Sequence, residues 1–180
     1  MHKDIERVLH NEEAISEAVK RLGEQITRDY AGKKPVLLCV LKGASLFHAD
    51  LMRAIDLPCE VDFIVAKSYG MSAESSGKLR ILKEPDIDIK NRDVIIVEDI
   101  LDTAVTLSAL LHTLSLKEPA SLKTAVFLDK NLGTEKPVKA DYKCFDCENE
   151  FLVGYGLDYA EQYRNLPYVG ILKRGIYTDN

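Results

Sequence analysis

The chain has 180 residues, of which 46% are hydrophobic and 29% are charged, a composition typical of one globular domain with a single substantial core. Its formal net charge of −5 argues against a nucleic-acid partner, which would favour a basic surface. The longest uninterrupted apolar run, Val36–Leu41, is far shorter than the roughly 20 residues of a membrane helix, and the charged N-terminus lacks an apolar signal segment, so we expect a cytoplasmic protein without membrane contact.

The chain begins with a helix, a strand and a second helix. Asn11 suits the N-cap of a helix that continues at helical apolar spacing until Gly32. The run Val36–Leu41 shows no polar alternation, which is typical of a strand covered on both faces of a parallel sheet. A turn at 42–45 then precedes a helix with apolar positions at Leu46, Phe47, Leu51 and Ile55.

Three further strands are predicted along the chain, at Cys59–Ala66, Asp93–Glu98 and Leu122–Leu128. A helix follows the second of these, with an apolar stripe formed by Leu107, Leu110, Leu111 and Leu114. Because strands and helices alternate, we predict the α/β class with a mostly parallel sheet flanked by helices. No linker divides the chain, so we expect one domain over residues 1–180.

The stretch 68–92 interrupts this pattern. It lacks core periodicity, and Gly70, Ser75 and Gly77 favour mobility. A stretch of this length in a compact domain usually forms a lid or a binding loop. We predict a mobile loop that covers the substrate, with a small hairpin at its base; a disordered connector is the alternative.

The four cysteines give a weak signal. Cys39 and Cys59 lie in apolar runs and are expected to be small buried side chains. Cys144 and Cys147 have the spacing of metal and redox sites, but no second pair or nearby histidine completes a four-ligand zinc site. We expect two reduced cysteines on a strand, with a zinc or redox role as the alternative.

Acids and hydroxyls crowd the end of one predicted strand, in VIIVEDILDTAVTL (Val94–Leu107). The acids are Glu98, Asp99 and Asp102, and the hydroxyls belong to Thr103 and Thr106. Ligands of open parallel sheets bind beyond the carboxyl ends of the strands, where a helix N-terminus can hold a phosphate. The carboxylates need other partners, and sugar hydroxyls or a divalent cation are both candidates. A simple helix cap is the alternative, although a cap needs only one polar residue.

This motif resembles the phosphoribosyl-diphosphate (PRPP) signature of the type I phosphoribosyltransferases: an aliphatic run, two acids, two variable residues, Asp-Thr and a closing Thr. Other segments resemble the hypoxanthine-guanine phosphoribosyltransferases, in the order found in that family. They are VLKGASLFHADL (Val40–Leu51), KSYG (Lys67–Gly70), FLDKN (Phe127–Asn131) and FLVGYGLDYAEQYRNLPYVG (Phe151–Gly170). Together they span nearly the whole chain.

The resemblance implies a fold and a reaction. The fold is that of the type I phosphoribosyltransferases, with a small hood built from the N-terminal segment and from about residues 131–180. The reaction is purine salvage: transfer of the 5-phosphoribosyl group from PRPP to N9 of hypoxanthine or guanine, which yields diphosphate and the nucleotide IMP or GMP. The resemblance also implies Mg²⁺ as the cofactor and a homodimer or homotetramer.

Within the acidic motif, the resemblance implies that Glu98 and Asp99 contact the ribose hydroxyls and the metal ion. The residues that wrap the 5′-phosphate would be Asp102, Thr103, Ala104, Val105 and Thr106. Asp102 would also face N7 of the purine as the general base. The family commonly has glycine where this chain has Ala104, which implies either a helical φ or altered phosphate contacts.

Other residues would bind the diphosphate and close the site. By resemblance, Lys42 and Gly43 bind diphosphate, and the peptide bond before this lysine is often cis in the family. Arg164 would also contact diphosphate, and Asp158 would be a second magnesium ligand. Ser68 and Tyr69 would come over the site on the mobile loop and shield the transition state.

Three residues would recognise the base. Lys130 would donate a hydrogen bond to O6 of the purine, Phe151 would stack on its face, and Leu152 would offer backbone groups to its edge. The C-terminal LKRGIYTDN carries no expected catalytic role.

Two other functions remain as alternatives. A PRPP-binding regulatory protein would add a basic surface or a winged-helix domain, and this chain shows neither. An enzyme of the same fold could act on another base. Lys130 and the segment Phe151–Asp158 argue against adenine and pyrimidines but barely against xanthine, so the preference among hypoxanthine, guanine and xanthine stays open.

Overall fold

The computed structural model describes residues 1–69 and 78–178, apart from the side chains of residues 67–69 and 78–79. Within these ranges the helices are α1 (Glu12–Asp29), α2 (Ser45–Ala54), α3 (Val105–Ser115) and α4 (Arg174–Tyr177). The strands are β1 (Ile5–His10), β2 (Val36–Leu41), β3 (Glu60–Tyr69), β4 (Lys78–Lys83), β5 (Asp93–Leu101), β6 (Ser121–Lys130), β7 (Tyr142–Cys147), β8 (Leu152–Val153) and β9 (Val169–Leu172).

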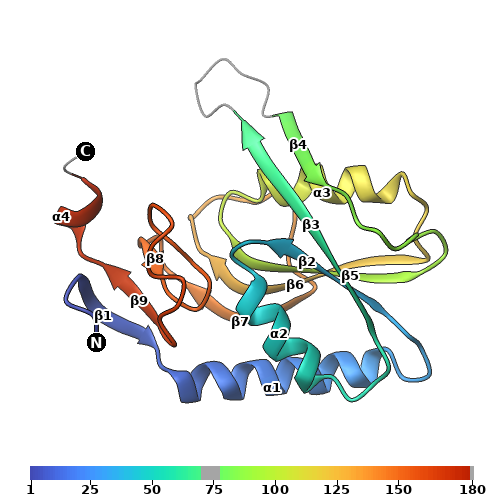
Figure 1. Cartoon of the computed structure of the whole chain (residues 1–180), viewed down its shortest axis with the longest axis horizontal. Coiled ribbons are helices and arrows are strands. Elements are labelled where there is room, and N and C mark those ends of the chain that lie inside the picture. The colour runs from blue at the N-terminus through green and yellow to red at the C-terminus, as the bar shows by residue number, and fades with distance from the viewer. Residues whose placement is uncertain (70–77, 179–180) are drawn as a thin grey trace.

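A twisted sheet with the order β4-β3-β2-β5-β6-β7 forms the centre of the described chain (Figure 1). All neighbouring strands in it run parallel except β3 and β4, which are antiparallel. The four strands predicted from apolar runs correspond to β2, β3, β5 and β6. The prediction of an α/β fold with a mostly parallel sheet is therefore confirmed.

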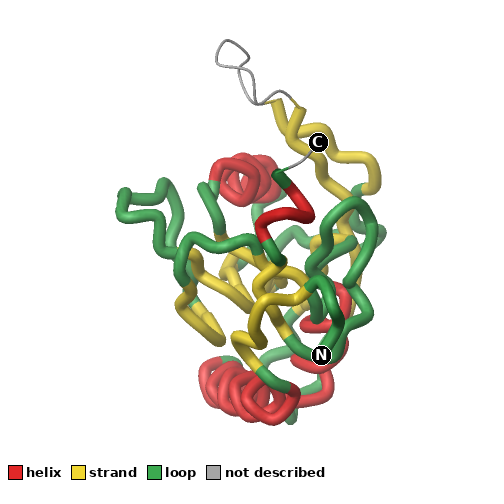
Figure 2. The backbone as a smooth tube through the Cα atoms, turned by 90° about the vertical axis from the view of Figure 1, so that its left-hand side faces the viewer, coloured by secondary structure: helices red, strands yellow, loops and turns green. Residues whose placement is uncertain are grey.

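Helices cover both faces of this sheet, with α1 and α2 on one side and α3 on the other (Figures 1 and 2). Leu37, Ile95 and Phe127 pack with α1 and α2. Their neighbours along the strands, Leu38, Ile96 and Val126, pack with α3. This alternation buries both faces, which explains the continuous apolar runs. The predicted cap at Asn11 is confirmed, because its side chain accepts a hydrogen bond from the N–H of Ala14 at 3.0 Å.

The two ends of the described chain meet in a small antiparallel sheet with the order β1-β9-β8 (Figure 2). We call this sheet and the loops between β8 and β9 the hood. Ile5, Val153 and Leu172 form its buried core. The predicted start of its C-terminal part, at about residue 131, is wrong because β7 returns to the central sheet beside β6. Burial of Tyr142 against α1, with its hydroxyl donating to Asp29 at 2.9 Å, holds β7 there.

The segment 68–92 is divided between the hairpin and the core. Strand β4 pairs with β3, which forms the predicted hairpin at the base, and residues 70–77 lie outside the described residues. The stretch after β4 is attached to the core: Ile89 is 1% exposed, and the N–H of Ile87 donates to Asp62 at 2.8 Å. Residues 78–92 therefore do not belong to the predicted mobile loop.

None of the helices within the described ranges is long and apolar enough to cross a membrane. The four cysteines are free, and Cys144 and Cys147 lie on β7, a strand as predicted. Burial raises the pKa of the Cys144 thiol to about 12, so this thiol stays protonated at neutral pH.

Candidate active site

The turn after β2 packs directly against the acids at the end of β5. The Leu41–Lys42 peptide bond that leads into this turn is cis, as the resemblance implied. A side-chain carbon at Gly43 would overlap the Asp99 carboxylate, and one at Gly156 would overlap the carbonyl of Gly43. Glycine is therefore required at both positions for the turn, the acid and the hood loop to approach one another.

The acid pair Glu98–Asp99 is half-buried at the end of β5. Burial and the neighbouring Asp99 carboxylate raise the pKa of Glu98 well above its ordinary value. Burial also raises the pKa of Asp99, against the opposing effects of its hydrogen bonds and of Arg164. The N–H of Ile100 donates to Asp99 at 2.7 Å and fixes its orientation. Two neighbouring carboxylates repel each other when both are ionised, and a bound cation would offset this repulsion.

Helix α3 begins without a side-chain cap from any described residue. Ala104 occupies its N-cap position with φ 62° and ψ 5°, a left-handed conformation, so the predicted alternative of a helical φ is wrong. Asp102, Thr103 and Val105 are exposed around it, and Thr106 is half-buried. The first N–H groups of α3 are thus left for another acceptor, which favours an anion at this point.

Asp102, the residue after β5, and Lys130, the last residue of β6, form an ion pair. The Lys130 Nζ lies 3.4 Å from Asp102 Oδ2, and 12% of the Lys130 side chain is exposed, against 49% for Asp102. The parallel pairing of β5 with β6 brings these two residues together, since Leu101 is opposite Asp129. The pair offers one acceptor and one donor side by side.

A network of charged residues joins the turn after β2 to the hood loop. Arg164 donates to the carbonyl of Gly156 at 2.8 Å and pairs with Asp158 at 2.8 Å and Glu161 at 3.2 Å. Glu161 also pairs with Lys42 at 3.1 Å. Among the described residues, the Nε of Arg164 is buried and has no partner. Arg164 therefore holds the loop in shape and keeps one donor available.

The predicted metal ligands form no complete cage. No group of three His, Cys, Asp or Glu in the described part of the chain is arranged to hold a metal ion. Glu98 and Asp99 are adjacent, whereas Asp158 is engaged by Arg164. This donor set fits Mg²⁺, which commonly binds one or two carboxylates together with waters and substrate phosphates.

The remaining predicted residues lie on the hood. Leu152 is on the edge strand β8, and the carbonyl of the preceding Phe151 accepts from the N–H of Leu172 at 2.9 Å. Because backbone groups alternate in direction along a strand, the N–H and C=O of Leu152 point away from β9. They are free of the hood sheet, as recognition of a base edge requires. The side chains of Ser68 and Tyr69 lie outside those described.

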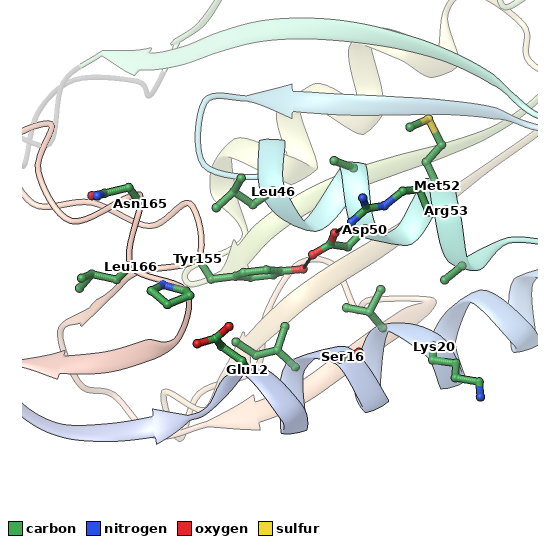
Figure 3. A pocket seen from close by; sticks show the side chains of 15 residues that line it. Glu12, Ser16, Lys20, Leu46, Asp50, Met52, Arg53, Tyr155, Asn165 and Leu166 are labelled. Atoms are coloured by element: carbon green, nitrogen blue, oxygen red, sulfur yellow. Dashed lines mark hydrogen bonds and ion pairs between the residues drawn. The ribbon is translucent and has the colours of Figure 1, made fainter. Parts of the chain in front are cut away.

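A cavity of about 830 Å³ between α1, α2 and the hood loop contains none of the predicted site residues (Figure 3). Tyr155 enters it from the hood loop, and its hydroxyl donates to Asp50 on α2 at 2.6 Å (Figure 3). Arg53 pairs with the same carboxylate. These contacts attach the hood loop to the helix that follows Lys42 and Gly43, so they help to position the candidate site.

Gly156 and Glu161 were not predicted from the sequence. Gly156 lies within FLVGYGLDYAEQYRNLPYVG, but its contact with Gly43 joins segments far apart in the chain. Glu161, with φ 61°, bridges Lys42 and Arg164 from an exposed turn. The one sequence signal for an unusual turn in this loop was the presence of two glycines, Gly154 and Gly156, two residues apart.

Comparisons with known proteins identify the family of this chain. The phosphoribosyl transferase domain family matches residues 7–160. The hypoxanthine-guanine phosphoribosyltransferase of Streptococcus thermophilus is 50% identical over 178 residues, which cover 99% of both chains. A crystal structure of a hypoxanthine phosphoribosyltransferase from Staphylococcus aureus is 42% identical and superimposes with a TM-score of 0.95, covering 99% of this chain and 97% of that one. The corresponding Trypanosoma cruzi enzyme in a ternary substrates complex is 40% identical with a TM-score of 0.92, over 98% of this chain and 100% of that one.

Proposed function

The chain belongs to the phosphoribosyl transferase family, among its hypoxanthine-guanine phosphoribosyltransferases. On this basis we propose a role in purine salvage for each residue of the candidate site. The enzyme transfers the 5-phosphoribosyl group of PRPP to N9 of hypoxanthine or guanine and releases diphosphate.

The proposal rests mainly on the ion pair between Lys130 and Asp102. Guanine presents N7 and O6 next to each other on one edge, and hypoxanthine shares both atoms. In the tautomer of the free base that is protonated at N7, N7–H is a donor and O6 is an acceptor. Lys130 donates to O6, while Asp102 faces N7 and accepts the proton that the base loses there. The separation of 3.4 Å between Nζ and Oδ2 suits two polar groups that lie side by side on one edge of the purine, the exocyclic O6 and N7. Phe151 stacks on the base, and the backbone of Leu152 meets its edge.

The sugar and phosphates are bound at the turns beside this pair. The uncapped start of α3, with Thr103, Val105 and Thr106, binds the 5′-phosphate, and the left-handed Ala104 replaces the usual glycine there. Lys42, Gly43 and Arg164 bind the diphosphate. Glu98 and Asp99 accept hydrogen bonds from the ribose hydroxyls and, with Asp158, hold Mg²⁺. When bound, Mg²⁺ would offset the negative charge of the departing diphosphate.

The direct test is a PRPP-dependent assay against a panel of nucleobases. We expect turnover of hypoxanthine and guanine, with the product identified as IMP or GMP. A protein that binds PRPP but turns over none of the bases would be a regulator instead. Preferential use of xanthine would leave the PRPP assignments intact and change only the base.

Removal of magnesium should lower turnover on the order of 10²-fold, because several kilocalories per mole of charge stabilisation are lost. Free PRPP carries several negative charges, and Glu98 and Asp99 would repel it without a bridging cation. The measurement is activity after exhaustive chelation, with magnesium added back as the control. Full activity in the metal-free enzyme would contradict the metal roles of these acids.

Gly43→Ala should lower kcat/KM for PRPP on the order of 10²-fold, since a displacement of about 1 Å at a reacting group can have this effect. The added methyl would push the Asp99 carboxylate out of place. Gly175→Ala is a matched control, because a carbon added at Gly175 meets nothing within 4 Å. Equal kcat/KM values for the two variants would exclude the proposed role of the turn.

We also propose that the enzyme works in the cytoplasm as a homodimer or homotetramer and binds no nucleic acid. Free cysteines and a net charge of −5 support the compartment and the absence of a nucleic-acid partner. Light scattering during size-exclusion chromatography measures the assembly.

A further inference from the structure

The end of the described chain reaches the ring that is proposed to stack on the base. The rings of Phe151 and Tyr177 are stacked, with centroids 4.6 Å apart and an interplanar angle of 23°. Tyr159 meets Phe151 edge-on, at 5.5 Å and 85°. Both arrangements are favourable for aromatic pairs. Phe151 is thus held in one orientation by two other rings.

Backbone contacts fix Tyr177 in this place. The N–H of Lys173 donates to the carbonyl of Asp4 at 2.9 Å, which ties the start of α4 to the N-terminal end of the hood. Within α4, the N–H of Ile176 donates to the carbonyl of Lys173 at 2.9 Å, and Ile176 packs against the hood core. The position of Tyr177 is therefore built by the fold rather than by one side-chain contact.

Tyr177 and the base approach Phe151 from opposite sides. Helix α4 lies on the outer side of the hood, away from the central sheet, in both views of the molecule (Figures 1 and 2). Lys130 ends β6 and Asp102 follows β5 in the central sheet, so a base held by them would reach the hood from the side of that sheet. Because Tyr177 stacks on one face of the Phe151 ring, a purine that stacks on Phe151 must use the other face.

We propose that Tyr177 is a positioning residue for the base, which extends the purine site to the C-terminal segment; this inference rests on the proposed function. Tyr177 stacks on one face of Phe151 and Tyr159 contacts the ring edge-to-face, so the ring is already ordered when the purine arrives. A pre-ordered ring loses less side-chain freedom on binding, which strengthens binding of the base.

Steady-state kinetics of Tyr177→Ala test the proposal. We expect KM for hypoxanthine to rise about 2- to 10-fold, the range that corresponds to one aromatic pair. The kcat and the KM for PRPP should stay unchanged, because Tyr177 contacts neither the phosphates nor the reacting atoms. Tyr177→Phe keeps the ring and should restore the KM. Tyr163→Phe is the control for a loosened hood: it loses a hydrogen bond to Asp4 but has no stacking contact with Phe151.

The possible results distinguish a wrong role for Tyr177 from a wrong function for the enzyme. A lower KM in Tyr177→Ala would mean that Tyr177 competes with the base for Phe151, and an unchanged KM would remove the C-terminal segment from the site; either result overturns the proposal. Failure of the wild-type enzyme to use hypoxanthine would instead contradict the proposed function itself.

A binding measurement that needs no turnover gives a second test. The chain has no tryptophan, so Phe151→Trp introduces a single fluorophore at the stacking position. Excitation selective for tryptophan separates its emission from that of the eight tyrosines, and titration with IMP should quench this emission. Adding Tyr177→Ala to this variant should weaken IMP binding about 2- to 10-fold. Equal affinities with and without Tyr177 would overturn the proposal even if the kinetic constants shift.

Discussion

Asp102→Asn should lower kcat for nucleotide formation by about 10²–10⁴-fold, the usual effect of removing a positioned general base. The amide has the size of the carboxylate but cannot accept the N7 proton. PRPP binding should persist, because in the proposed site the start of α3 binds most of the 5′-phosphate. Single-turnover kinetics and a PRPP titration measure the two effects separately.

The same variant also tests the simplest structural alternative, a helix cap. Ala104, and not Asp102, occupies the N-cap position of α3, so Asp102→Asn should change the free energy of unfolding by less than about 0.5 kcal/mol. Asp146→Asn, at an exposed acid on β7, is the matched control for loss of one charge. A near wild-type rate in Asp102→Asn would exclude the general-base role.

Adenine should be used about 10⁴-fold less efficiently than hypoxanthine, because a polar site that cannot satisfy its group rejects an analogue by about this factor. Lys130 has three donors and no acceptor, and adenine presents an amino donor where hypoxanthine presents O6. The Lys130 side chain is only 12% exposed, so water compensates poorly for the lost hydrogen bond. The measurement is kcat/KM for each base at saturating PRPP.

The variant Lys130→Met tests directly whether Lys130 recognises the base. The variant should raise KM for hypoxanthine strongly and leave the PRPP affinity nearly unchanged. Lys139→Met, at an exposed lysine of the segment that follows, is the control. Efficient adenine turnover by the natural enzyme would overturn the assignment of Lys130 and of the 6-oxopurine class.

Local periodicity allowed most of the central sheet to be predicted from the sequence. Strand β2 has the predicted bounds, because Val36–Leu41 is buried on both faces and reads as one apolar run. Strand β7 was missed as part of this sheet, since Lys143 and Asp146 interrupt its apolar residues and only Tyr142 and Cys147 are fully buried. Edge strands carry mixed patterns of this kind because one side meets solvent.

The candidate site was predicted where its residues form a contiguous motif, and missed where distant segments meet. The acids at the end of β5 could be identified from Val94–Leu107 alone. A side chain at Gly156 would overlap the carbonyl of Gly43, which is more than a hundred positions away in the sequence. The left-handed φ of Ala104 could not be predicted either, because alanine rarely adopts this conformation and the residues after it favour a right-handed helix.

The pairing of β1 with β9 has a consequence for synthesis of the protein. Ile5 is opposite Leu172, so the hood sheet can form only after the chain has left the ribosome as far as β9. Strands β2, β3, β5 and β6 need no residue beyond Lys130 and can assemble earlier. A nascent chain that stops before Val169 can contain the strands that carry the acid pair and Lys130, but it leaves β1 and β8 without the strand that joins them. The proposed base-binding part of the hood, at Phe151 and Leu152, is therefore completed only after β9 has been translated, later than the strands that carry the acid pair and Lys130.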